Sequence, residues 1–64
     1  MLGKNIKKFR QKRKLTQDKL ARLADIPYTS ITKIETGVIK QPSVQAVAKI
    51  AKALNTTVEE LLKS

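Results

Sequence analysis

Cysteine and histidine are both absent from the 64 residues of this chain. Disulfide bonds, and zinc sites built on thiolate or imidazole ligands, are therefore excluded. The five carboxylates are scattered along the sequence, so no nucleophile stands beside a general base and no group of acids is placed to hold a metal ion. We expect a protein that is not an enzyme and that uses no metal and no cofactor.

Long apolar runs are also missing, since the longest has three residues, at positions 46–48. The sequence therefore has no segment that is long enough to span a bilayer and no apolar stretch typical of a signal peptide. We expect a cytoplasmic protein. A chain this short buries only about 60% of the surface that it exposes when unfolded, which predicts a single domain, over residues 1–64, with an economical core.

Positive charge is what the chain has in excess. Fourteen Lys and Arg residues against five Asp and Glu residues give a formal net charge of +9. Half of the basic residues stand in the first fourteen positions: Lys4, Lys7, Lys8, Arg10, Lys12, Arg13 and Lys14. Such a charge on a small domain indicates a polyanionic partner, either nucleic acid or an anionic membrane. The alternative is a lysine-rich surface that only keeps the protein in solution.

Apolar residues recur at helical spacing and predict five short helices, at about 3–13, 17–24, 28–36 and 44–54, and from 57 onward. Thr16 and Ser43 are suited to cap the second and fourth helices, and "TVEE" from Thr57 to Glu60 reads as a capping box. Asn55 is suited to a left-handed helix end. The residues expected to face inward are Leu2, Ile6, Phe9, Leu20, Leu23, Ala24, Ile31, Ile34, Val44, Val47, Ala48, Ile50, Ala51, Leu54, Val58, Leu61 and Leu62. We predict a compact all-α domain.

The second and third predicted helices are separated only by Asp25, Ile26 and Pro27. So short a connection makes the helices cross steeply, which is the geometry of a helix-turn-helix. The turn should need a residue with positive φ, and Asp25 tolerates this conformation better than most residues other than glycine. An ordinary corner between two helices of a small bundle is the alternative interpretation of this spacing.

The third predicted helix has two different faces. With about 100° per residue, Ile31 and Ile34 point inward, whereas Thr29, Lys33 and Thr36 share the opposite face, with Thr32 and Ser30 beside them and Tyr28 at the start. Hydroxyl groups, threonine methyl groups and a lysine are side-chain groups that read base edges in the major groove of DNA. This face has no acid. The alternative is a threonine-rich face that meets only solvent.

Two opposite charges lie at the edges of the predicted buried faces. Glu35 lies about 40° around its helix from Ile31, and Arg10 lies at about the same angle from Ile6. An unpaired charge is costly to bury, so we predict a partly buried ion pair between Arg10 and Glu35 that joins the first helix to the third.

Two segments together resemble a known family: "LTQDKLARLADIPYTSITKIETG", and "P-S…AVAKIAKALNTTVEELL" after it. They are similar to the Cro/phage-repressor-like helix-turn-helix family, also called XRE, and the similarity covers about Ile6 to Leu62. The resemblance implies a five-helix, lambda-repressor-like domain that regulates transcription, as a repressor, by binding double-stranded operator DNA. Binding would occur as a homodimer on a pseudo-palindromic site.

The resemblance also implies roles for individual residues. Tyr28, Thr29, Thr32 and Lys33 would contact bases, and Thr16, Gln17, Thr36 and Lys40 would contact the sugar-phosphate backbone. The Arg10–Glu35 pair matches a buried ion pair of phage-repressor members. The chain departs from the family at Asp25, where glycine is usual, and at Tyr28, where glutamine is common. Its loop has Val38, Gln41 and Ser43 where relatives often have basic residues, so phosphate contact there rests on Lys40 or is shared with the first helix.

Other interpretations remain open at this point. A protein-interaction module on the same scaffold, such as an antitoxin, is compatible with the same residues. The basic first helix alone is also typical of a membrane-active protein, but the caps and apolar faces of the other helices favour a folded domain without a membrane role. If the chain is a homodimer, we expect Val58, Leu62 and the turn at 54–58 to form its surface. The chain is either a complete regulator or the N-terminal domain of a longer one.

Overall fold

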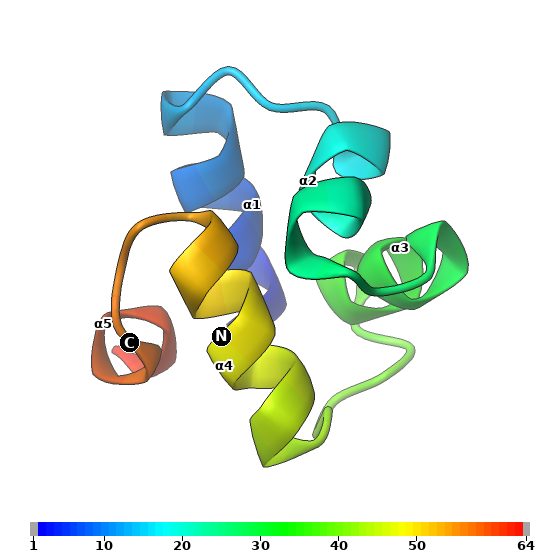
Figure 1. Ribbon diagram of the computed structural model, residues 1–64. Helices are drawn as coiled ribbons and strands as arrows, with labels where there is room; N and C mark the ends of the chain where they lie inside the picture. The colour runs from blue at the N-terminus through cyan, green and yellow to red at the C-terminus, as the bar shows by residue number, and fades with distance from the viewer. Residues whose placement is uncertain (1, 64) are drawn as a thin grey trace.

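The computed structural model describes residues 2–63, which form five helices: α1 (Leu2–Lys12), α2 (Gln17–Ala24), α3 (Tyr28–Thr36), α4 (Val44–Ala53) and α5 (Val58–Leu62). Figure 1 shows them as one compact group of helices without a sheet in the described part of the chain. The all-α prediction is confirmed. The predicted bounds of α2 and α3 agree with the structure, those of α1 differ by one residue at each end, and α4 ends one residue earlier than predicted.

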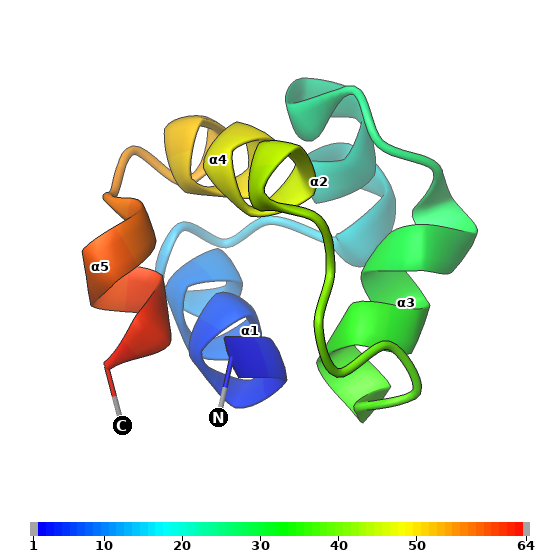
Figure 2. The same ribbon diagram turned by 90° about the horizontal axis from the view of Figure 1, so that it is seen from below.

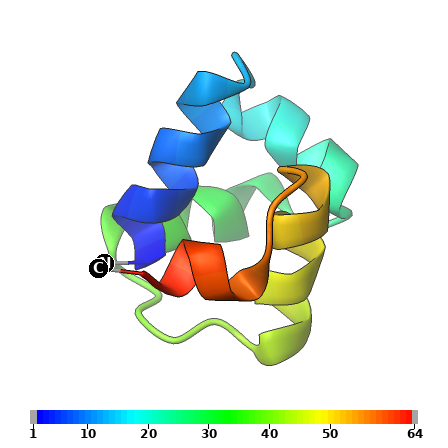
Figure 3. The ribbon, with the colours of Figure 1, turned by 90° about the vertical axis from the view of Figure 1, so that its left-hand side faces the viewer.

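The helices pack around a small core. α1 contacts α3 and α5, α2 contacts α3 and α4, and α4 contacts α5. Figure 2 shows α1 between α3 and α5, which lie on opposite sides of it. In Figure 3 the start of α1 and the end of α5 lie close together, and the side chain of Asn5 donates hydrogen bonds there to the carbonyl groups of Leu61 and Lys63. The largest fully buried side chains are Ile6, Leu20, Ile31, Ile50, Leu54 and Leu61.

Side-chain caps begin three of the helices. The hydroxyl oxygens of Thr16, Ser43 and Thr57 each accept a hydrogen bond, at 3.1 Å, from the backbone N–H three residues later. Each cap satisfies a donor that the first turn of a helix leaves without an intrahelical partner. Instead of completing a capping box with Thr57, the carboxylate of Glu60 lies 3.3 Å from the ammonium group of Lys63.

A residue in the left-handed conformation follows each of the first four helices. Asp25 and Asn55 have φ values of 57° and 56°, as predicted, and Gly37 has a φ of 88°. After the end of α1, Lys14 also has a positive φ, of 57°. The sequence gives no sign of this conformation, because lysine is not among the residues that favour the left-handed region.

Four of the residues that were predicted to face inward are exposed. Leu23, Val44 and Leu62 are 57%, 80% and 60% exposed, and Ala48 is exposed as well. The reason is that the buried strip along each of these helices covers fewer positions than the apolar residues in its sequence. In α2 the strip is centred between Leu20 and Ala21, so that Leu23 lies about 100° away from its centre. In α5, a single turn, only Leu61 is buried.

None of the helices in the described residues, 2–63, has both the length and the apolar character that crossing a membrane requires.

Candidate nucleic-acid interface

The turn between α2 and α3 fixes the angle of the two helices. Asp25, in the left-handed conformation, donates its N–H to the carbonyl of Arg22 at 3.2 Å, and the N–H of Ile26 reaches the carbonyl of Ala21 at 3.0 Å. These two bonds end α2 as a Schellman motif does. Pro27 then precedes α3, where the missing N–H of a proline costs nothing. Figure 1 shows that α3 crosses α2 steeply after this turn.

The inner face of α3 is fully occupied. Ile31 and Ile34 are 0% and 3% exposed and belong to the core cluster. Glu35 is buried beside them, at 8% exposed, and is the one acid in the sequence of this helix.

An ion pair accounts for the buried acid. Arg10 of α1 donates from Nε to Oε2 of Glu35 at 2.7 Å and from Nη2 to Oε1 at 3.1 Å, which is a bidentate contact. The third nitrogen, Nη1, donates to the carbonyl of Leu15 at 2.7 Å. The pair predicted from the sequence is therefore present, and it joins α1 and the turn after α1 to α3.

Gln17 completes this network. Its side-chain amide donates to Oε1 of Glu35 at 3.0 Å, so the start of α2 is tied to α3 as well. The resemblance implies that Gln17 contacts a phosphate. In the structure, its side-chain amide nitrogen donates a hydrogen bond to Glu35. Sequence reasoning missed this contact because glutamine gives no charge signal that would pair it with a distant acid.

The outer face of α3 presents the side chains that were predicted to contact bases. Thr29 and Lys33 are exposed, Tyr28 is 49% exposed, and Thr32 is half-buried. Thr32 donates its hydroxyl proton to the carbonyl of Thr29 at 2.8 Å. The hydroxyl oxygen of Thr32 can therefore still accept a hydrogen bond on the outer face, next to the methyl group of the same side chain.

The residues predicted to contact the DNA backbone lie at the end of α3, in the loop after it and at the start of α2. Thr36 is exposed at the end of α3, where its hydroxyl donates to the carbonyl of Thr32 at 2.9 Å. Lys40 is exposed in the loop that leaves α3. Thr16 is exposed at the start of α2, which the contact of Gln17 with Glu35 holds close to α3.

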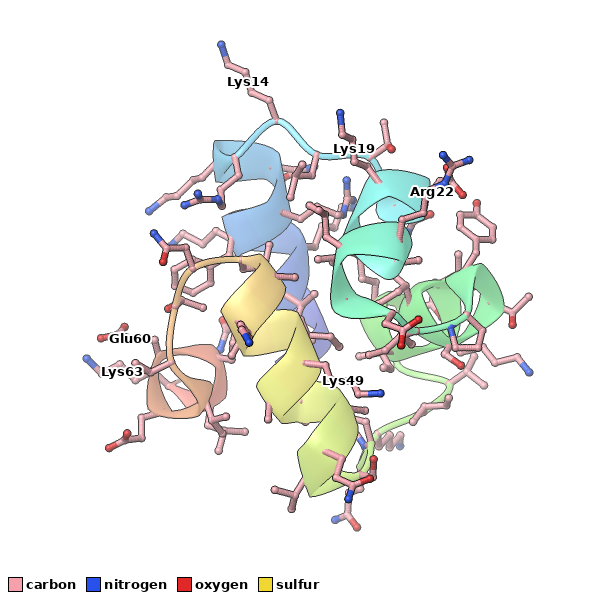
Figure 4. The ribbon with its side chains drawn as sticks, viewed as in Figure 1. Lys14, Lys19, Arg22, Lys49, Glu60 and Lys63 are labelled. Carbon is pink, nitrogen blue, oxygen red and sulfur yellow. The ribbon has the colours of Figure 1, made fainter. Side chains whose placement is uncertain are left out.

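Two of the exposed acids are each paired with a nearby cation. Asp18 on α2 lies within 3.2 Å of Arg22, one turn later, so its charge is balanced locally. Figure 4 shows Glu60 with Lys63 on α5, on the opposite side of the molecule from α3. Lys33 therefore stands on a helix face without a neighbouring acid of its own helix, since Glu35 points inward.

Five helices with a steep, tightly closed α2–α3 turn and an exposed, acid-free face on α3 define a helix-turn-helix domain. The sequence comparison agrees: the model of the helix-turn-helix family matches residues 6–61, and the chain belongs to this XRE-type family of DNA-binding transcriptional regulators. The comparison with curated protein sequences finds no match.

Solved structures of SinR are similar to the chain over its whole fold. The N-terminal DNA-binding domain of SinR from Bacillus subtilis is 28% identical with a TM-score of 0.96, and the match covers 100% of this chain and 93% of that one. SinR, the master regulator for biofilm formation, in complex with DNA is 28% identical with a TM-score of 0.95, over 98% of this chain and 100% of that one. In the complex of SinR with SinI, the match has a TM-score of 0.96 at 28% identity and covers 100% of this chain but 62% of that chain.

Proposed function

We propose that this chain binds double-stranded DNA sequence-specifically by inserting α3 into the major groove, and that it acts as a transcriptional repressor in the cytoplasm by binding rather than by catalysis. The observation that carries the proposal is the division of α3. Its one acid is turned inward and paired with Arg10, which leaves an outer face of hydroxyl, methyl and ammonium groups. A polyanion attracts such a face, and base edges match its groups.

Within this proposal the exposed residues have separate roles. Tyr28, Thr29, Thr32 and Lys33 contact base edges, because they lie on the outer face of α3. The sugar-phosphate contacts come from the start of α2, the end of α3 and the loop after it: Thr16, Gln17, Thr36 and Lys40. For Gln17 the backbone N–H at the start of α2 is the better donor to a phosphate, since a side-chain N–H is given to Glu35.

We further propose that residues 1–64 act as one domain that binds a pseudo-palindromic operator as a homodimer. Two-fold related helices fit half-sites that are one turn of DNA apart. Val58, Leu62 and the turn at 54–58 remain our choice for the dimer surface. Support comes from the exposure of Leu62 and from a shallow, mostly apolar hollow beside it, which Val44 and Val58 also line.

The test is selection of bound duplexes from a random-sequence pool with the parent protein and with the Lys33→Ala and Lys40→Ala variants. The parent should enrich a site with two-fold symmetry. Lys33→Ala should relax the preference at one base position per half-site, at a cost of about 1–3 kcal/mol in binding free energy. Lys40→Ala should weaken binding to all sequences alike, and the slope of log K against log salt concentration should become smaller by about 1. Equal behaviour of the two variants would contradict the assigned roles, and an unenriched pool would contradict the function.

A protein partner is the second candidate. The specific observation in its favour is that the similar SinR is known in complex with another protein, SinI. Leu23 on α2 and Val38 after α3 are exposed, at 57% and 71%, and are available for such a contact. An antitoxin role on this scaffold predicts a stable 1:1 complex with a co-encoded protein in the absence of DNA, measured by light scattering of the purified pair.

A further inference from the structure

Lys14 stands at a backbone position that favours glycine. Its φ of 57° lies in the left-handed region, two residues after the end of α1. A residue with a Cβ atom is strained there relative to glycine, which is the commonest residue at this point after a helix. The other non-glycine residues with positive φ in the described part of the chain are Asp25 and Asn55, and both are types that tolerate it. The backbone therefore gives no reason for a lysine at position 14.

The turn that carries Lys14 is held rigidly. The N–H of Lys14 donates to the carbonyl of Gln11, and the N–H of Leu15 donates to the carbonyl of Arg10, both at 3.0 Å. Arg10 in turn donates to the carbonyl of Leu15 at 2.7 Å while it holds Glu35 of α3. The position of Lys14 is thus fixed relative to α3 by side-chain and backbone bonds, although the lysine itself is exposed.

A second exposed lysine lies at the same end of the molecule. Figure 4 shows the side chains of Lys14 and Lys19 both extending from the end where the α1–α2 turn meets the start of α2. The sequence has no acid before Asp18, and the carboxylate of Asp18 lies within 3.2 Å of Arg22. In the sequence, Lys14 and Lys19 stand on either side of Thr16 and Gln17, where the proposed function places a phosphate.

We propose that Lys14 and Lys19 bind phosphates of duplex DNA that lie outside the segment read by α3. A strand whose phosphate meets the start of α2 would continue past the α1–α2 turn, so these lysines lengthen the contact with the sugar-phosphate backbone at the outer end of each half-site. The contact of the Lys14 ammonium group with a phosphate then explains why a lysine, and not a glycine, occupies this strained position. This inference rests on the proposed function, and it adds backbone contacts that the α3 loop, with Lys40, does not provide.

The test separates charge from backbone strain. Lys14→Gly removes the cation and relieves the strain, so its unfolding midpoint in urea should rise, whereas its affinity for the selected duplex should fall about threefold to tenfold. The slope of log K against log salt concentration should decrease by about 0.9. Lys14→Asn should lose affinity by the same factor, because asparagine tolerates the conformation and has no charge. Lys19→Gln should reduce the slope by the same amount.

Lys63→Gln is the matched control, since it removes one charge just after α5, on the opposite side of the molecule from α3. Its salt slope should equal that of the parent. If Lys14→Gly and Lys63→Gln have the same slope, the proposal is wrong. A second experiment uses a duplex shortened to the segment read by α3: the parent should lose more affinity on it than Lys14→Gly, which has only the contact of Lys19 left to lose. An equal loss by both proteins would place the lysine contact inside that segment and overturn the inference.

Failure of the inference and failure of the proposed function are distinguishable. If the chain selects no duplex site, the proposed function fails before this comparison begins. If it selects a site and Lys33→Ala alters the preference while Lys14→Gly changes neither affinity nor salt slope, only the inference about Lys14 and Lys19 is wrong.

Discussion

The two faces of α3 differ in nearly every chemical respect. On the inner face, Ile31 and Ile34 are buried in the core and Glu35 is held by Arg10. On the outer face, Thr29 and Lys33 are exposed. Residues that hold the helix in place and residues that are available to a partner therefore alternate within nine positions. Substitutions on the first face should change the free energy of unfolding, and substitutions on the second should change DNA binding.

This division also explains why so poor a helix-forming sequence is helical. Three threonines and two isoleucines occupy the nine positions of α3, and β-branched residues lower helix propensity. Most of the stability of a helix in a protein comes from tertiary packing of one face rather than from propensity. Burial of Ile31 and Ile34 outweighs the unfavourable propensity, so the outer residues are free to be chosen for binding.

The largest expected effect comes from breaking the ion pair of the inner face. Arg10→Met leaves Glu35 buried, with a charge that the amide of Gln17 does not neutralise. Removing one partner of a buried pair costs about 3–5 kcal/mol, so this variant should lose most of its stability in urea unfolding. Lys8→Met removes an exposed cation from the same helix and should change the free energy of unfolding by less than about 0.5 kcal/mol. An unchanged midpoint for Arg10→Met would show that the pair contributes nothing to stability.

The second prediction concerns the close approach of α1 to the inner side of α3 at Gly3. Gly3 is buried against the end of α3, where an added Cβ atom would collide with the carbonyl oxygen of Ile34 and lie 3.1 Å from that of Glu35. Both are backbone atoms, so the two helices would have to separate. Gly3→Ala should therefore cost about 1–3 kcal/mol, measured by urea unfolding, although alanine is the better helix former. Lys4→Ala, at the exposed neighbouring position, should change stability by less than about 0.5 kcal/mol. A stabilised Gly3→Ala variant would mean that the helices are not in contact there.

The sequence predicted the features that depend on local chemistry. Short polar residues marked the caps at Thr16, Ser43 and Thr57, and residue type marked the left-handed ends at Asp25 and Asn55. The inner face of α3 was also predictable, because Ile31, Ile34 and Glu35 keep helical spacing. The Arg10–Glu35 contact followed from the cost of leaving either charge buried alone.

The remaining features depend on how the helices meet in space. Leu23, Val44 and Leu62 follow the apolar pattern, yet no neighbouring helix of the described chain covers them well enough to bury them. The contact of Gln17 with Glu35 joins residues on two helices, and no spacing rule connects them. The positive φ of Lys14 is set by the way α1 ends against Arg10 and Leu15, and lysine itself gives no sign of it.

The variant with the smallest expected effect on stability distinguishes the two faces of α3 most directly, because it removes a single functional group from the outer face. Thr32→Val keeps the shape and a methyl group but removes the hydroxyl, which bonds only the carbonyl of Thr29 within its own helix. The free energy of unfolding should change by less than about 0.5 kcal/mol, while preference at one base position should weaken by about 1 kcal/mol, since an acceptor for a base amino group is lost. Thr32→Ser, which keeps the hydroxyl and loses the methyl group, should retain that preference. Competition binding with single-base variants of the selected duplex measures this preference. If the bases rank identically for Thr32→Val and the parent, Thr32 does not read DNA through its hydroxyl, and the residues proposed to contact bases are reduced to Tyr28, Thr29 and Lys33.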